Sequence, residues 1–255
     1  MKQRSAEILC IGTEILMGDI VNTNAAYLAK ELAGLGITVY HQSVVGANPE
    51  RLQESLQLAF SRADLVITTG GLGPTYDDLS KETIARYFGR ELVMDPESLH
   101  AIECHFLRLN RVMTDNNKKQ AMMPERCTIF ANHNGTAPGC AIEGEGEQQG
   151  KTAIMLPGPP REMKPMFEEG VKPFLLKDSD TRLVSHTMHF FGIGESMLEN
   201  ILRDLMETSL NPTVAPYAKT GEVQLRVTAR VKNGEDPEQL LQPVMNQIQE
   251  KVGEF

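Results

Sequence analysis

The stretch DLVITTGGLGPTYDD, residues 64–78, joins an apolar run to a glycine-rich loop and two adjacent aspartates. Residues 64–71 are predicted to form a strand, and residues 79–88 a helix. Glycines let the backbone turn sharply and approach a ligand without a Cβ clash, and the amino end of a helix attracts anions. The loop is therefore predicted to lie at the carboxyl end of a strand and to contact a ligand there.

The same alternation of apolar and amphipathic segments runs through the chain up to Phe88. In chain order, the predicted strands and helices are residues 6–12, 22–36, 37–46, 49–63, 64–71 and 79–88. Strands that alternate with helices are typical of a parallel sheet with helices on both faces. We therefore predict an α/β fold, a three-layer sandwich around a mostly parallel sheet.

The following part of the chain is less regular. Residues 95–125 are predicted to be helical and polar, residues 127–160 to form two strands around a turn, and residues 161–176 to form a helix. GEGEQQGKT, residues 144–152, is similar to a phosphate-binding loop, but five residues separate its first and last glycines where that loop needs four. We interpret it as a hairpin turn.

A polar segment, KDSDT at residues 177–181, marks the predicted boundary between two domains, residues 1–177 and 182–255. Beyond it, EVQLRVTARV at 222–231 alternates apolar and polar residues, which is typical of a strand with one buried face. We predict a small α+β domain whose sheet is open to solvent on one side and covered by two helices on the other. Its predicted elements are residues 182–192, 194–208, 213–218, 222–231 and 236–252.

Composition excludes several classes of function. The chain has a formal net charge of −9 and no basic block, which argues against non-specific nucleic-acid binding, since that depends on Lys and Arg. No apolar run approaches the ~20 residues that cross a bilayer, and no signal-peptide pattern is present. We therefore expect a cytoplasmic protein without a nucleic-acid or membrane partner. The cysteines, which we expect to be buried free thiols because they lack metal-site spacing, are Cys10, Cys104, Cys127 and Cys140.

Three carboxylates follow the glycine loop: Asp77, Asp78 and Glu82. One of them would suffice to cap the helix, so capping does not account for all three. Loops at 12–24 and 156–163 should reach the same edge of the sheet. Carboxylates without histidines favour a hard cation such as Mg²⁺, which bridges one or two carboxylates to substrate phosphates. The sequence therefore predicts that loop amides bind phosphate oxygens while carboxylates hold a metal.

Several motifs together resemble one family. IGTEILMGDIVNTNAAYLAKEL, TTGGLGPTYDD, NGTAPG and LPGPPREM, in this order, are similar to the first domain of CinA (competence/damage-inducible protein A) proteins, which has the molybdopterin-binding fold. GIGES and PYAKTGEVQLRVTA resemble the small linker domain that follows it. The resemblance implies a homodimer that hydrolyses ADP-ribose to AMP and ribose 5-phosphate with a divalent metal (Mg²⁺, Co²⁺ or Ni²⁺), aided by potassium. It also implies a part in pyridine-nucleotide recycling.

Many CinA proteins continue into a nicotinamide-mononucleotide deamidase domain. The residues up to Phe255 do not include that domain, so deamidase activity is not expected of them. Within the predicted site, we assign catalysis to Asp77, Asp78 and Glu82, and metal binding to Glu14, Asp19 and Asp78. The residues predicted to bind the substrate are Asn24, Gly70, Gly71, Gly73, Pro74, Thr75, Gly135, Pro157, Gly158 and Pro159.

Two positions depart from the pattern of the superfamily. Where CinA proteins often have V-G-D-N this chain has VGAN, so Ala47 replaces an acid, and Leu72 replaces the threonine of a G-G-T-G loop. Loss of an acid that binds metal or substrate would weaken activity. Two alternatives stay open: a molybdopterin-binding module without hydrolysis, to which these two departures give little support, and a weakened scaffold that dimerises and docks a deamidase.

Overall fold

The computed structural model describes residues 5–177, 181–219, 221–232 and 234–255. They fall into two compact units, one formed mainly by residues up to 177 and the other mainly by residues from 181 onward. Of the predicted boundary segment 177–181, residues 178–180 lie outside the described residues. Within the described part of the chain, no helix is long and apolar enough to cross a membrane.

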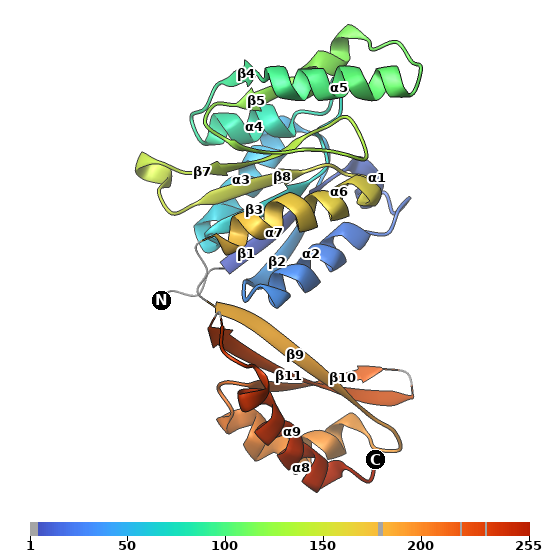
Figure 1. Cartoon of the computed structure of the whole chain (residues 1–255), viewed down its shortest axis with the longest axis vertical. Helices are drawn as coiled ribbons and strands as arrows, with labels where there is room; N and C mark the ends of the chain where they lie inside the picture. Colours follow the sequence, from blue (N-terminus) through green and yellow to red (C-terminus); the bar gives the residue numbers. More distant parts are fainter. Residues whose placement is uncertain (1–4, 178–180, 220, 233) are drawn as a thin grey trace. The chain divides into compact units, whose positions relative to one another are not determined.

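A six-stranded sheet is the centre of the first unit (Figure 1). Its strands, in spatial order, are β2 (Thr38–Val45), β1 (Ser5–Ile11), β3 (Leu65–Thr69), β8 (Thr152–Leu156), β7 (Gly139–Glu143) and β6 (Thr128–Phe130). β2, β1, β3 and β8 are parallel, while β7 and β6 are antiparallel to their neighbours. Every residue of β3 and β8 is buried, as expected for strands covered on both faces. The predicted mostly parallel sheet is confirmed.

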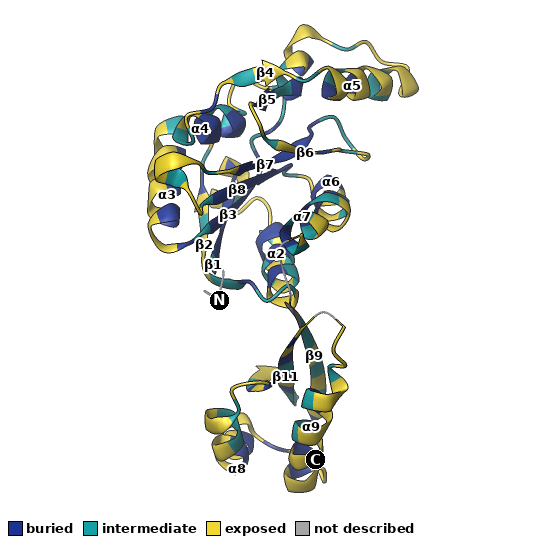
Figure 2. Ribbon diagram, turned by 60° about the vertical axis from the view of Figure 1, so that its left-hand side comes forward, coloured by how far each residue is buried: buried dark blue, intermediate teal, exposed yellow. Residues whose placement is uncertain are grey.

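Helices cover both faces of this sheet (Figures 1 and 2). On one face, α3 (Pro49–Arg62) and α4 (Ser80–Tyr87) bury Leu56 and Ile84 against β1, β3, β7 and β8. On the other face lie α2 (Thr23–Gly34) and a helical stretch made of α6 (Pro160–Met166), a π-helical turn and α7 (Lys172–Leu176). The short helix α1 (Thr13–Leu16) between β1 and α2 buries no residue.

Residues 95–125 are not one helical region, and the prediction was wrong there. Helix α5 (Pro96–Arg108) ends because Asn110 takes the left-handed conformation, which Asn adopts more readily than most residues. A 3₁₀ helix, η1 (Asp115–Ala121), follows, and β4 (Leu92–Met94) pairs with β5 (Met122–Pro124) in a separate two-stranded sheet.

The interpretation of residues 144–152 as a hairpin turn is confirmed, because they join the antiparallel strands β7 and β8.

The second unit is a three-stranded antiparallel sheet with two helices. Its elements are β9 (Thr181–Phe190), α8 (Glu195–Thr208), β10 (Thr213–Lys219), β11 (Glu222–Lys232) and α9 (Glu238–Val252). β11 is central and alternates as predicted, since Val223, Leu225 and Val227 pack with α8 and α9 in one core while Arg226 is exposed. The predicted small α+β domain is confirmed.

Candidate functional site

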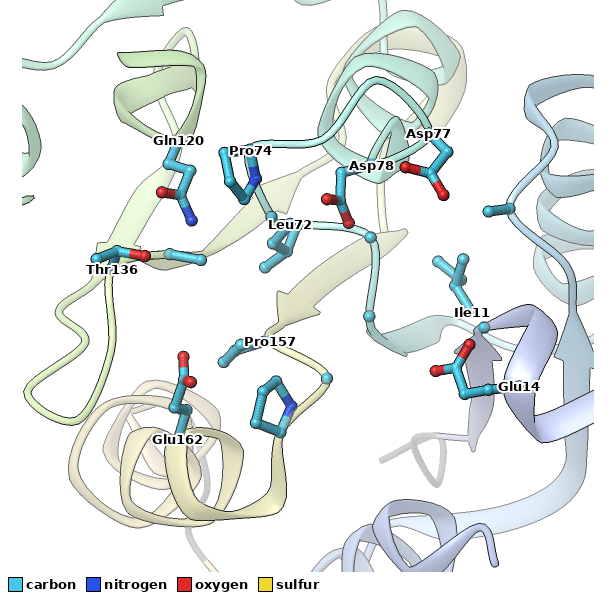
Figure 3. Close-up of a pocket in the computed structure, with 18 of the residues that line it drawn as sticks. Ile11, Glu14, Leu72, Pro74, Asp77, Asp78, Gln120, Thr136, Pro157 and Glu162 are labelled. Atoms are coloured by element: carbon cyan, nitrogen blue, oxygen red, sulfur yellow. The ribbon is translucent and has the colours of Figure 1, made fainter. Parts of the chain in front are cut away.

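A cavity of about 410 Å³ opens beyond the carboxyl ends of β1, β3 and β8 (Figure 3). The glycine loop after β3 forms one wall, and the segment after β8, which carries Pro157, Gly158 and Pro159, forms another. The start of α1 also contributes to the lining, and the rest of it is formed by Ala47, Gln120, Thr136, Ala137 and Glu162. Segments far apart in the sequence therefore meet at the edge of the sheet where α/β folds bind ligands.

Two glycines of the loop have no room for a side chain. Gly70 has φ +105°, and a Cβ on it would lie 2.1 Å from the carbonyl oxygen of Ile11. Gly71 has φ +69°, and a Cβ on it would lie 2.0 Å from Ser80 Oγ. That hydroxyl donates a hydrogen bond of 2.9 Å to the carbonyl oxygen of Gly70. The loop is therefore held against β1 and the first residue of α4, with its backbone facing the cavity.

Asp77 and Asp78 fold back onto their own turn. Asp78 Oδ2 accepts a hydrogen bond of 3.0 Å from the backbone N–H of Thr75, and the Thr75 hydroxyl lies within hydrogen-bonding distance of both carboxylates. The N-cap of α4 is Leu79, which makes no side-chain capping bond. Neither aspartate caps the helix, and both line the cavity. The hydrogen bond from Thr75 lowers the pKa of Asp77, which favours its charged form.

Lys119, on η1, binds the backbone of this turn. Its ammonium donates to the carbonyl oxygens of Thr75, at 3.0 Å, and of Asp78, and it lies 3.5 Å from the Glu82 carboxylate. Glu82 does not line the cavity, and its Oε2 is buried without a hydrogen-bond partner among the described residues. The predicted catalytic set is therefore divided, with Asp77 and Asp78 at the cavity and Glu82 beside Lys119.

Lys81 fixes η1 in turn. Its ammonium is buried and donates a hydrogen bond of 2.6 Å to the carbonyl oxygen of Gln120. Burial lowers the pKa of Lys81 to about 8, because the charged form is poorly solvated there. Gln120 itself forms part of the cavity wall. No sequence pattern indicates Gln120, because the segment around it is predicted only to be helical and polar.

Glu162, on the first turn of α6, is a further acidic residue of the cavity that was not among the assigned site residues. Its side chain is nearly buried, and its Oε2 accepts a hydrogen bond of 2.8 Å from the amide of Asn132. A Cβ on Gly135 would lie 2.1 Å from the same carboxylate, so that glycine makes room for Glu162. The motif LPGPPREM contains Glu162 and was the signal that could have identified it.

The predicted substrate-binding residues do not all line this cavity. Gly70, Gly71, Gly73, Pro74, Pro157, Gly158 and Pro159 do. Thr75 holds the aspartates instead, and Gly135 packs against Glu162. The amide of Asn24 donates to Thr69 Oγ1 (2.9 Å) and to the Gly158 carbonyl oxygen (2.7 Å), and Asn24 lines a smaller neighbouring cavity.

Only acidic residues supply charge to the lining of the main cavity. Those residues are Glu14, Asp77, Asp78 and Glu162, and no Lys, Arg or His lines it among the described residues. Their charges would repel a phosphate group, so an anion can bind only if backbone amides and a cation compensate for them.

The acidic side chains are spread over several segments. Within the described residues, no three His, Cys, Asp or Glu side chains lie close enough together to hold a metal ion by themselves. Asp19 lines neither this cavity nor its neighbour, whereas Glu14 lines both. Mg²⁺ commonly needs only one or two carboxylates when substrate phosphates and water complete its coordination. The adjacent Asp77 and Asp78 fit that kind of site.

Comparison with known proteins gives matches over both units. Residues 7–177 match the family model of a probable molybdopterin binding domain, and residues 185–255 match that of the damage-inducible protein CinA KH domain. A curated relative from Clostridium novyi (strain NT), described as competence-damage inducible, is 56% identical over 97% of this chain and 59% of its own length. One from Clostridium perfringens (strain ATCC 13124) is 55% identical over 98% of this chain and 60% of its own.

A solved structure is also similar. The protein CinA with unknown function from Thermoplasma acidophilum is 34% identical, with a TM-score of 0.60, over 66% of this chain and 98% of that one. This chain spans only about three fifths of the length of the curated relatives.

Proposed function

The chain belongs to the CinA family, and on that premise we propose that its first unit hydrolyses the pyrophosphate bond of ADP-ribose with the help of a divalent metal ion. Water is consumed, and AMP and ribose 5-phosphate are released. One observation carries the proposal: a glycine loop at the carboxyl end of β3 faces a cavity in which, within the described part of the chain, Glu14, Asp77, Asp78 and Glu162 are the only charged residues. A diphosphate with its metal ion satisfies both features, since the amides suit phosphate oxygens and the carboxylates suit the ion.

The roles of the residues follow from their contacts. Backbone amides of the loop at 70–73 bind the diphosphate, and the prolines beside Gly158 form a rigid opposite wall. Asp78 and Asp77 would hold the metal with Glu14, while Asp19 lines neither cavity. A bound Mg²⁺, Co²⁺ or Ni²⁺ would supply Lewis-acid chemistry, polarising phosphoryl oxygens and orienting a water molecule for attack. Thr75 and Lys119 keep the two aspartates oriented and Asp77 ionised.

A second function is supported by the match over residues 7–177 to a probable molybdopterin binding domain. In that case the first unit binds a pterin phosphate without cleaving it, and the carboxylates need no metal-activated water. The whole-length relatives extend well beyond this chain, so docking of a deamidase domain is a proposal about the longer protein only.

Calorimetry distinguishes the two functions. With Mg²⁺ present, we expect ADP-ribose to bind and to release heat, and with EDTA we expect no detectable binding because four carboxylates then face the diphosphate. Molybdopterin should bind more weakly than ADP-ribose under both conditions. Tight binding of molybdopterin, together with no heat of binding from ADP-ribose in Mg²⁺, would favour the pterin-binding function instead.

Ala47 is the position at which a missing carboxylate is expected to lower the turnover of the site. It lines the cavity directly before Asn48, the N-cap of α3, so an aspartate there would face the same space and would also suit the amino end of that helix. We expect Ala47→Asp to raise the turnover of ADP-ribose about tenfold or more at fixed Mg²⁺, by adding an oxygen ligand. Steady-state assays measure this. If the variant stays folded and as slow as the parent protein, position 47 does not limit the reaction.

A further inference from the structure

Two of the four cysteines lie side by side in the first unit. Cys127 directly precedes β6, and Cys140 is the second residue of β7, which runs antiparallel to β6. Because Thr128 pairs with Ala141, the register continued by one residue places Cys127 on the face of the sheet to which Cys140 points. A hydrogen bond joins the two thiols. The fold therefore brings together two sulfur atoms that are not neighbours in the sequence.

The two thiols differ in their access to solvent. Cys140 is fully buried in the core of the first unit, whereas Cys127 packs against that core and is partly exposed. The prediction that the cysteines are buried is therefore wrong for Cys127, which lies in the turn before β6. It is also wrong for Cys104, which is exposed on α5, a helix whose buried residues are Ser98 and Ile102. A small oxidant can reach Cys127 from solvent, and Cys140 is in contact with it.

A buried cation lies next to the pair. Lys81 Nζ is 3.8 Å from Met123 Sδ, and its positive charge acts on both thiols. The hydrogen bond from Cys140 lowers the pKa of Cys127, and the charge of Lys81 also lowers it. The same hydrogen bond, together with burial, raises the pKa of Cys140. Accessible thiols with a lowered pKa and a second thiol beside them are those that peroxides oxidise, so Cys127 is the attacking thiol.

We propose that Cys127 and Cys140 form a redox site, in which hydrogen peroxide converts the two thiols into a reversible disulfide. The Cys127 thiolate attacks one peroxide oxygen, the O–O bond breaks, and the other oxygen leaves as water after protonation. The Cys140 thiol then attacks the resulting sulfenic acid, so that an S–S bond forms, the S–O bond breaks and a second water leaves with the thiol proton. The two sulfur atoms lose two electrons together, and the peroxide gains them.

The disulfide closes the loop between β6 and β7. That loop carries Thr136 and Ala137, which line the main cavity, and Asn132, whose amide donates to Glu162. A crosslink between the two ends of a loop restricts the unfolded chain, so the oxidised first unit should be the more stable form. The redox site does not depend on the proposed hydrolysis, because neither thiol lines the main cavity.

The test treats the whole chain with hydrogen peroxide, alkylates the remaining thiols under denaturing conditions and maps the peptides by mass spectrometry. We expect a crosslinked pair of peptides that contains Cys127 and Cys140, is lighter than the two free peptides by two hydrogen atoms, and is separated by dithiothreitol. The unfolding midpoint of the oxidised protein, followed by circular dichroism, should rise by about 5 °C. Alkylation of both thiols after peroxide treatment, or a lower midpoint in the oxidised protein, overturns the proposal.

Two variants assign the steps. Cys140→Ala removes the resolving thiol and should leave a sulfenic acid at Cys127, which the diketone dimedone traps. Cys104→Ser is the matched control, because Cys104 is exposed with its Sγ 3.5 Å from His100 Nε2, and the crosslink should form to the same extent without it. A disulfide that requires Cys104, or a folded Cys140→Ala protein without the dimedone adduct at Cys127, contradicts the proposal. If Cys140→Ala does not fold, the crosslink in the parent protein still decides.

Discussion

Asp78→Asn is expected to slow ADP-ribose hydrolysis by about 10²-fold while the protein stays folded. The asparagine Oδ1 can still accept from the backbone N–H and hydroxyl of Thr75, so the turn is kept. What is lost is the charge that holds the metal, and removing one preorganised charge-stabilising group typically costs 10²–10³ in rate. Circular dichroism checks that the variant stays folded, and steady-state kinetics with Mg²⁺ measures the rate of hydrolysis.

Asp95→Asn is the matched control for Asp78→Asn. Asp95 is the N-cap of α5, where its Oδ2 accepts a hydrogen bond of 2.8 Å from the backbone N–H of Ser98, and it does not line the main cavity. Asn and Asp rank alike as N-caps, so stability and turnover should both stay close to those of the parent. Wild-type turnover in a folded Asp78→Asn protein would remove Asp78 from the metal site.

Gly70→Ala is expected to destabilise the first unit by about 3 kcal/mol or more. Its φ of +105° is one that L side chains rarely adopt, and the new Cβ would meet the backbone carbonyl of Ile11 at 2.1 Å. Backbone strain and overpacking each cost on the order of 1–3 kcal/mol. The chain has no tryptophan, so urea unfolding is followed by circular dichroism.

Gly158→Ala is the matched control on the opposite wall. A Cβ there would be 3.6 Å from Gly70 Cα, which is ordinary van der Waals contact, and Gly158 does not have a left-handed φ. We expect a change below about 1 kcal/mol, as for a surface substitution without strain. If Gly70→Ala were as mild as Gly158→Ala, the close approach of the loop to β1 would not hold in solution.

The parallel sheet was predictable because its signals are local. Each strand is an apolar run followed by a helix with its own periodicity, and the alternation of β11 follows directly from one buried face. Residues 95–125 were not predictable in the same way. Their helix stops at a single left-handed Asn110, and pairing of β4 with β5 joins segments that lie far apart in the chain.

The candidate site was predictable only where residues follow a strand directly. Gly70 and Asp78 belong to the loop after β3, so topology alone places them at the sheet edge. Gln120 reaches the cavity because buried Lys81 binds its backbone, a tertiary contact that leaves no sequence pattern. Asp19 is the opposite case: it was predicted to bind metal because its loop reaches the site, but the residue itself lines neither cavity.

The most direct measurement is chromatography of ADP-ribose incubated with the purified chain and Mg²⁺, Co²⁺ or Ni²⁺, beside an EDTA control. We expect AMP and ribose 5-phosphate in equal amounts with at least one of these metals and intact ADP-ribose in EDTA. Intact ADP-ribose under every metal condition, from a folded protein, would refute the proposed hydrolysis.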